Sequence, residues 1–419
     1  MANKFVHNKK CKLIAASVFD NMDYVKASVS MLSEADMKNK KFGRSYDVYL
    51  PDPGKVVQGI KADPSEIEEV AVPIYLDNFN TSVKLDVWEE LTDLEDFTAE
   101  VAAPKGENLA RQTQKNIVHN NIFKSFQVVV KTGAPGFDLL SDAAEALEDL
   151  SLAGDVVDFQ KPSILGKIAA SNVGKFYDTE TAKKLYSKAY IGTFANADHV
   201  GLAVVPTITT PSTLPNATLV AGTSAGDDSF VFDGIQGATT GDTLFEGMAY
   251  KVVDNNANPV KIVDPSGLET EQELVVIVTK IPYGYDTRSN GKKVLYRLGI
   301  PQIRIAKTGT AEGNPNAWCA SDATSFTLTP ALTASKKYVI GQTRLEKAFA
   351  FDGYKFKNLP GSENSEGPME GIGNARGVTV KMSQYGDGEY LEKLLRLDLP
   401  FGCGVIDPRL SVTTYLALN

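Results

Sequence analysis

One short motif in this chain has the residue types of a catalytic nucleophile. Gly222-Thr223-Ser224-Ala225-Gly226 fits G-x-S-x-G, the nucleophile elbow of hydrolases. That chemistry needs a strand before the serine, a helix after it and a histidine later in the chain. Two aspartates and a strand-like segment follow instead, and all three histidines, His7, His119 and His199, precede Ser224. The sequence therefore favours a flexible glycine and serine turn.

The histidines and carboxylates also lack the spacing of a metal site. His119 is expected near the end of a helix, where histidine interacts with the helix dipole. His199, beside Asp198, is expected in a solvated turn. The segment Asp254 to Asn258 begins like a calcium loop, but prolines at 259 and 265 occupy the positions of its glycine and its bidentate glutamate. We therefore expect no catalytic residue, no cofactor and no metal.

The composition is that of an ordinary globular protein. Of the 419 residues, 43% are hydrophobic and 23% are charged, and the length allows two or three domains. A formal net charge of -9 argues against a protein that coats nucleic acid, because such proteins carry a basic stripe. No apolar run reaches the ~18 residues of a membrane span. The short apolar run Leu13 to Phe19 argues against a signal peptide.

The elements of the first half mix strands and helices after a lysine-dotted arm at residues 1 to 41. Alternation predicts strands over 46–50 and 70–76, with 83–87 as a return strand. Apolar spacing and Pro104 predict a helix over 104–123, and a clear apolar stripe predicts another over 137–152. Further elements are expected at 88–100 (an acidic helix), 126–131 (a strand) and 179–188 (a helix).

The residue pattern becomes typical of an all-β segment after the prolines at 206, 211 and 215. Turns rich in Gly, Asn, Asp and Pro separate short strand candidates, as in a small barrel or sandwich. The candidates are 229–232, 248–254, 273–281, 293–298, 303–307 and 325–328. Two long turns are expected, at 254–272 and 282–292.

The last stretch, Arg376 to Asn419, is the most informative. Strands are expected at 378–382 and 395–399, joined by a turn at Tyr385-Gly386-Asp387-Gly388. The chain is then expected to break at Pro400 and Pro408 before a final strand, 411–418. This order of strand, Gly-Asp-Gly turn, strand, Asp-Pro-Arg and strand resembles the C-terminal part of tailed-bacteriophage major capsid proteins, in the short-tailed-phage group that carries an inserted β-domain.

The resemblance implies an α+β fold of the Hong Kong 97 type with an inserted all-β, barrel-like domain. By this resemblance each part of the chain is given a place. The segments are an N-terminal arm at 1–41, an extended β-loop at 42–87, a peripheral domain with a spine helix at 88–136 and 377–402, an axial domain at 137–211, 336–376 and 403–419, and the inserted domain at 212–335.

The function that the resemblance implies is mechanical. Many copies would tile an icosahedral shell of pentamers and hexamers around double-stranded DNA, in the virion, after assembly in the host cytoplasm. A scaffolding protein and a portal are the implied partners, and a decoration protein is a candidate partner that the resemblance leaves open. Neither membrane binding nor sequence-specific DNA binding is expected. Acidic residues between Asp86 and Glu100 form either a solvated face or a contact for a basic partner. The proposed assembly contacts are Glu89, Glu90 and Asp93 with Lys9, Lys10 and Lys12.

The alternative from another class is a carbohydrate-binding surface protein with 212–335 as its binding module. The scarcity of tryptophan, with only Trp88 and Trp318, argues against it.

Overall fold

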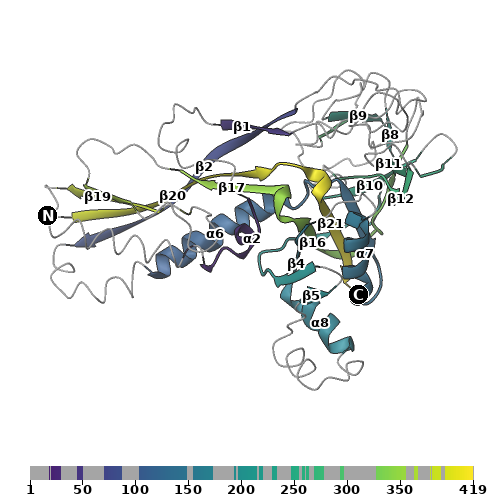
Figure 1. Ribbon diagram of the computed structural model, residues 1–419, viewed down its shortest axis with the longest axis horizontal. Coiled ribbons are helices and arrows are strands. Elements are labelled where there is room, and N and C mark those ends of the chain that lie inside the picture. The colour runs from purple at the N-terminus through teal and green to yellow at the C-terminus, as the bar shows by residue number, and fades with distance from the viewer. Residues whose placement is uncertain are drawn as a thin grey trace, which may run out of the picture. The chain divides into compact units, whose positions relative to one another are not determined.

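The structure is a computed structural model of the 419-residue chain. The residues that it describes are 18, 20–29, 45–50, 70–86, 103–148, 154–172, 193–194, 197–214, 217–219, 229–233, 247–253, 257–259, 261–263, 269–277, 293–296, 327–354, 363–366, 378, 380–387 and 392–418. The fold is α+β, with many strands and few helices (Figure 1). It divides into two compact units. The first unit comprises Met1–Val48, Val72–Val118 and Phe349–Ile406, and the second comprises Tyr49–Ala71, His119–Ala348 and Asp407–Asn419.

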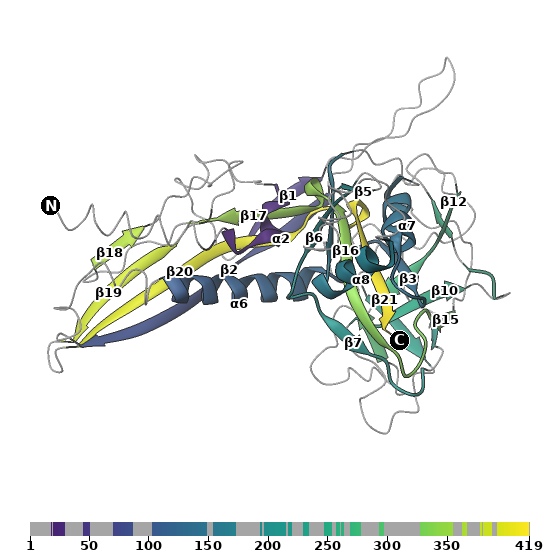
Figure 2. The same ribbon diagram turned by 90° about the horizontal axis from the view of Figure 1, so that it is seen from below.

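The first unit contains a long sheet with the strand order β1-β2-β20-β19-β18, and β17 also pairs with β20. The strands are β1 (Ser45–Leu50), β2 (Val70–Asp86), β17 (Phe349–Gly353), β18 (Glu363–Glu366), β19 (Lys381–Asp387) and β20 (Glu392–Val405). Helix α6 (Ala103–Asn121) lies beside this sheet (Figure 2) and buries Leu109, Ala110 and Ile117. A one-turn helix, α2 (Asp23–Lys26), packs Tyr24 edge-on against Phe349 at 5.3 Å between ring centroids. The helix predicted from Pro104 is confirmed.

The predicted return strand at 83–87 is wrong, because β2 runs on as one strand. Residues Leu76 to Asp86 pair with Gly402 to Glu392 on β20. The polar residues between Leu76 and Val83 lie inside the sheet. Asn78 donates from Nδ2 to Asp398 at 2.9 Å, and the ring of Phe79 stacks on Phe401 at 6.0 Å between centroids. Contacts with a strand more than 300 residues away therefore override the local turn pattern.

The C-terminal hairpin also differs from the prediction in two places. Tyr385 and Gly386 pair with β20, and the hairpin closes after Asp387, which pairs with Glu392. The predicted turn therefore starts too early. Pro400 does not break the chain but lies within β20, opposite Asn78.

Pro400 fits inside the strand because of a gap in the pairing on one side. Strand β19 pairs with β20 only as far as Asp398, and β17 pairs from Phe401 onward. The carbonyl of Pro400 accepts a hydrogen bond from the Tyr354 amide at 3.4 Å, so the proline nitrogen faces this same gap. Proline removes only a donor that the gap would leave unpaired.

The second unit contains a seven-stranded sheet with the order β3-β21-β16-β4-β6-β5, and β7 also pairs with β16. Its strands are β3 (Gln127–Lys131), β4 (Val156–Gln160), β5 (Thr193–Phe194), β6 (Ala197–Gly201), β7 (Thr207–Thr209), β16 (Lys337–Leu345) and β21 (Ser411–Leu418). The predicted strands at 126–131 and 411–418 are confirmed. The last strand, β21, lies inside the sheet between β16 and β3.

Two helices accompany this sheet. Helix α7 (Phe137–Glu148), predicted from its apolar stripe, packs Ala146 and Leu147 against Leu345 and Val412. Helix α8 (Pro162–Asn172), which the sequence analysis did not predict, connects the parallel strands β4 and β6. Parallel neighbours require such a crossover. Two short 3₁₀ turns, Glu346–Ala348 and Pro408–Leu410, complete the described helical elements.

A second sheet in this unit is antiparallel, with the order β13-β10-β15-β8-β9-β14. Its strands are β8 (Ala217–Leu219), β9 (Ser229–Asp233), β10 (Ala249–Val253), β13 (Val275–Ile277), β14 (Lys293–Tyr296) and β15 (Thr327–Pro330). All six fall within 212–335. The expected long turn at 254–272 is wrong in part, because β11 (Lys261–Val263) and β12 (Glu269–Glu273) form a hairpin there. The elements predicted at 88–100, 179–188 and 303–307 lie outside the described residues, and the predicted segment boundaries stay predictions.

Candidate functional site

The six proposed assembly contacts lie outside the described residues. They are Glu89, Glu90, Asp93, Lys9, Lys10 and Lys12. Ser224 of the G-x-S-x-G motif and the start of the calcium-like segment also lie outside them. Within the described ranges, no group of three or more His, Cys, Asp or Glu side chains could hold a metal ion. No helix in the same ranges is both long enough and apolar enough to cross a membrane.

The one histidine prediction that the structure contradicts concerns His199. It was expected in a solvated turn beside Asp198, but it lies on β6 with a side chain only 1% exposed. Its Nδ1 is 2.8 Å from Oδ2 of Asp158, on the neighbouring parallel strand β4. His119 lies in the last turn of α6, as predicted.

Asp158 is the centre of a buried row of polar side chains. Its Oδ1 accepts hydrogen bonds from Thr343 Oγ1 at 2.7 Å and from Gln160 Nε2 at 2.9 Å. Gln160 Nε2 also donates to Thr414 Oγ1 at 3.0 Å. Asp158 is paired directly with His199 on one side and with Thr343 on the other, so strands β6, β4, β16 and β21 each contribute to the row. We call these five residues the polar row.

The polar row shares a face of the sheet with the apolar contacts of α7. Alternate residues of a strand point to the same face, so Asp158 lies on the side of Val156, and Thr343 on the side of Leu345. Gly341 makes room for the row, since a Cβ at this position would overlap the Gln160 amide. The row is closed to solvent and its members are hydrogen-bonded to one another, which indicates that it stabilises the sheet.

The sequence carried a faint signal of this row. In Val156-Val157-Asp158-Phe159-Gln160 the polar residues alternate with apolar ones, which usually indicates a solvent-facing side. Here both faces of the sheet are covered, and Asp158 and Gln160 are only 1% exposed. The sequence alone does not show that a second layer covers the polar face.

A second buried pair lies in the first unit. The Tyr46 hydroxyl donates to Asp352 Oδ2 at 2.6 Å, and both residues are buried. Burial, and then the charge of Asp352, raise the pKa of Tyr46 well above its usual range. Gly402 accommodates this pair, because a Cβ there would lie 3.0 Å from the Tyr46 ring.

In the Asp-Pro-Arg segment noted in the sequence, Asp407 and Arg409 form a local ion pair, which we call the Asp407 clasp. Asp407 accepts a hydrogen bond from the backbone amide of Arg409 at 3.0 Å and bonds from its guanidinium at 2.5 to 2.9 Å. Both side chains are largely buried, at 9% and 12% exposed. The clasp fixes the 3₁₀ turn through which the chain passes from β20 into β21.

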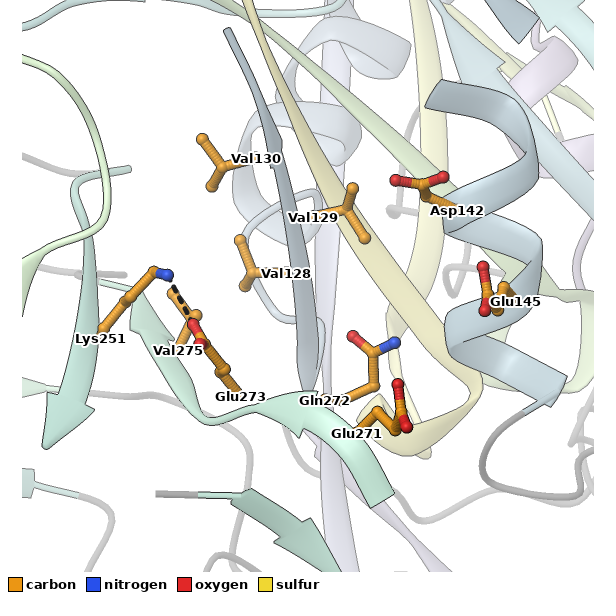
Figure 3. A pocket seen from close by; sticks show the side chains of 10 residues that line it. All are labelled: Val128, Val129, Val130, Asp142, Glu145, Lys251, Glu271, Gln272, Glu273 and Val275. Atoms are coloured by element: carbon orange, nitrogen blue, oxygen red, sulfur yellow. Dashed lines mark ion pairs between the residues drawn. The ribbon is translucent and has the colours of Figure 1, made fainter. Parts of the chain in front are cut away.

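The second unit also has a surface pocket of about 400 Å³ (Figure 3). Its lining residues are Val128, Val129, Val130, Asp142, Glu145, Lys251, Glu271, Gln272, Glu273 and Val275. Lys251 forms an ion pair with Glu273 at 2.5 Å, and Lys131 forms one with Asp142. The hydrogen bond to Asp142 is the main reason why the pKa of Lys131 is raised. The lining thus contains four carboxylates and one lysine, and two of the carboxylates are paired with lysines.

Comparison with known proteins gives matches among solved structures. No protein-family model matches the chain, and no curated protein matches it significantly. The capsid of the cyanophage P-SCSP1u matches with 12% identity and a TM-score of 0.45, over 94% of this chain and 86% of that one. The mature capsid of bacteriophage PhiM1 matches with 10% identity and a TM-score of 0.40, over 89% and 82%. The capsid of the Helicobacter pylori bacteriophage KHP30 matches with 10% identity and a TM-score of 0.41, over 89% and 84%. All three of these solved structures are bacteriophage capsids.

Proposed function

We propose that this chain is the major capsid protein of a tailed phage. Many copies tile an icosahedral shell of pentamers and hexamers, and the shell encloses double-stranded DNA without reading its sequence. The role is structural and involves no catalysis. A scaffolding protein and a portal guide and close the shell, a decoration protein is a further partner, and the site of action is the virion after assembly in the host cytoplasm.

The observation that carries this proposal is the C-terminal strand order. Strands β19 and β20 form the predicted hairpin, and β20 continues beside β2. The Asp407 clasp then turns the chain, and β21 lies between β3 and β16 in the seven-stranded sheet. These are the residues that resemble the C-terminal part of tailed-phage capsid proteins.

Exposed features of the first sheet also favour repeated contacts between copies. The described sheet ends at β1 on one side and at β18 on the other. Open strand edges invite pairing with another chain. Tyr75 on β2 is 68% exposed and Tyr49 on β1 is 62% exposed, and tyrosine is enriched in protein interfaces. In a closed shell such modest contacts recur in every copy, and the whole becomes stable.

The test is assembly of the full chain, expressed with and without a scaffolding protein and examined by size-exclusion chromatography and negative-stain imaging. Closed shells of uniform diameter are expected. A matched variant lacking residues 55–69, within the predicted extended loop, should give a folded subunit that forms no closed shells. A protein that stays monomeric under every one of these conditions would contradict the proposed function.

The carbohydrate-binding alternative has no specific support. The two tryptophans of the chain, Trp88 and Trp318, lie outside the described residues. No described feature of the sheet at 217–330 favours a sugar over a protein partner.

A further inference from the structure

The antiparallel sheet of the second unit is joined to the seven-stranded sheet by a base of two paired segments. The chain leaves the seven-stranded sheet after β7 and returns to it at β16, and the strands of the antiparallel sheet all lie between these two in the sequence. The Thr210 amide donates to the Lys336 carbonyl at 2.8 Å. The Ser335 amide donates to the Pro211 carbonyl at 3.0 Å. The outgoing and returning segments are therefore bonded to each other.

The side chain of Thr210 ties this base together. Its hydroxyl accepts a hydrogen bond from the Lys336 amide at 2.9 Å and donates one to the Thr333 carbonyl at 2.7 Å. The Thr333 amide in turn donates to the hydroxyl of Tyr338, on β16, at 2.8 Å. Thr210 and Tyr338 are both buried. The base is thus fixed both internally and to the seven-stranded sheet.

A further contact holds the antiparallel sheet at a point distant from its base in the sequence. The hydroxyl of Tyr415, on β21, donates to the carbonyl of Gly247 at 2.8 Å, just before β10 begins. Both residues are buried. Gly247 has a φ of 89°, and a Cβ at this position would lie 2.8 Å from the Phe123 ring. Glycine therefore allows the close approach on which this hydrogen bond depends.

The hydrogen bond of Tyr415 is coupled to the position of the antiparallel sheet. Burial raises the pKa of Tyr415 above its usual range, so the hydroxyl keeps its proton and donates throughout the ordinary pH range. A buried tyrosine hydroxyl normally has a hydrogen-bond partner. Breaking the bond strands both this hydroxyl and the Gly247 carbonyl, unless water reaches them. Water reaches them only where the two sheets separate.

The pocket in Figure 3 provides room for such a separation. One wall of the pocket comes from α7 and β3, and the other comes from β10, β12 and β13 of the antiparallel sheet and its hairpin. The two ion pairs at the pocket each stay on one wall. Lys131 pairs with Asp142 on the first wall, and Lys251 pairs with Glu273 on the second. The antiparallel sheet can therefore shift here without breaking either pair.

We propose that Tyr415 is a latch that holds the antiparallel sheet against the seven-stranded sheet, and that the antiparallel sheet pivots on its paired base when the latch opens. The last strand of the chain thereby sets the position of a sheet built from strands between residues 217 and 330. This inference goes beyond the proposed function and does not depend on it, because every contact lies within one subunit.

Thiol labelling of the full chain measures how often the latch opens. In a chain whose cysteines at 11, 319 and 403 are replaced by serine, Ala417→Cys places a single thiol on β21. Ala417 is two residues from Tyr415, so it lies on the same face of the sheet, and it is only 2% exposed. A buried thiol reacts only while its site is open. Its rate of reaction with a thiol reagent therefore reports the population of the open form.

Tyr415→Phe keeps the ring and removes the hydroxyl. The thiol of Ala417→Cys should then react about 5- to 150-fold faster, the factor that corresponds to one lost buried hydrogen bond. As a first control, Ala146→Cys reports from the opposite face, where α7 packs, and its rate should not change. As a second control, Thr413→Val removes a hydroxyl from the same strand and face as Tyr415. That hydroxyl donates to the Ile122 carbonyl at 2.7 Å, so its loss should leave the Ala417→Cys thiol unchanged.

The other outcomes would overturn the proposal in different ways. Unchanged labelling of Ala417→Cys in Tyr415→Phe would mean that the hydroxyl does not act as a latch. Equal acceleration of Ala417→Cys and Ala146→Cys would mean that the whole unit opens and that no pivot exists. Equal acceleration in Thr413→Val and Tyr415→Phe would mean that β21 as a whole is weakened. None of these results depends on whether the protein forms shells, so the latch and the proposed function are tested separately.

Discussion

Replacing Asp158 by alanine removes the acceptor at the centre of the polar row. Three donors lose a bond at once: His199 Nδ1, Thr343 Oγ1 and Gln160 Nε2. Gln160 keeps its second bond, to Thr414, so its loss is partial. Each buried polar group left without a partner costs about 1–3 kcal/mol. Summed over the three donors that lose a bond, we expect a destabilisation of about 3–5 kcal/mol.

Hydrogen exchange measured by mass spectrometry is the suitable assay for this loss. A chain with two compact units is expected to unfold in more than one step, so a single melting temperature does not report on one sheet. Amide exchange reports the opening of each segment separately. Since each 1.4 kcal/mol corresponds to a factor of about ten, amides of β4, β6 and β16 should exchange on the order of 10² to 10³ times faster in Asp158→Ala. The long sheet of the first unit should keep its protection.

Three further variants test which interactions of the polar row cause the loss of stability in Asp158→Ala. Asp158→Asn keeps the volume but loses one acceptor oxygen, and should cost about 1–3 kcal/mol. Thr343→Val removes a single bond and should cost about 1 kcal/mol. Glu148→Ala, exposed on α7, should stay within about 0.5 kcal/mol of the natural chain. If Asp158→Ala exchanged like Glu148→Ala, the polar row would contribute nothing to stability and our account of it would be wrong.

Four other predictions follow from the structure and the sequence. Gly341→Ala should cost about 1–3 kcal/mol, measured by the same exchange assay, because its Cβ overlaps the engaged Gln160 amide. Tyr46→Phe should destabilise the first unit by about 1.5–3 kcal/mol at pH 8. That difference should shrink above about pH 10, because Tyr46 then ionises in the unfolded chain and stays neutral in the native one. Urea unfolding at several pH values measures it. A difference that grows with pH would contradict the raised pKa of Tyr46. Reversing the charges of Glu89, Glu90 and Asp93 together should slow assembly, followed by light scattering, most clearly at low salt; rates that do not change with salt would exclude this face as a contact. The fragment 212–335, expressed alone, should be a monomer with a cooperative melting transition and dispersed amide resonances.

The local sequence pattern was sufficient to predict those helices and strands that depend mainly on their own residues. The apolar stripe of Phe137 to Glu148 fixes both the helix and the face that it buries. Proline in the first turn correctly marked the start of α6. The alternation of Ser411 to Leu418 predicted a strand. The resemblance to capsid proteins likewise came from the order of residues after Arg376.

Only the tertiary structure decided features that depend on distant strands. The return strand predicted at 83–87 is part of β2, because Asn78 and Phe79 find their partners, Asp398 and Phe401, on the distant strand β20. Pro400 resembles a break until the gap between β19 and β17 removes the need for its N–H. His199 and Asp158 are 41 residues apart and meet because a crossover helix brings β4 and β6 side by side. A strand's sequence shows which residues share a face, but only the packed sheet shows what covers that face, and burial then turns a polar pattern into a hydrogen-bonded interior.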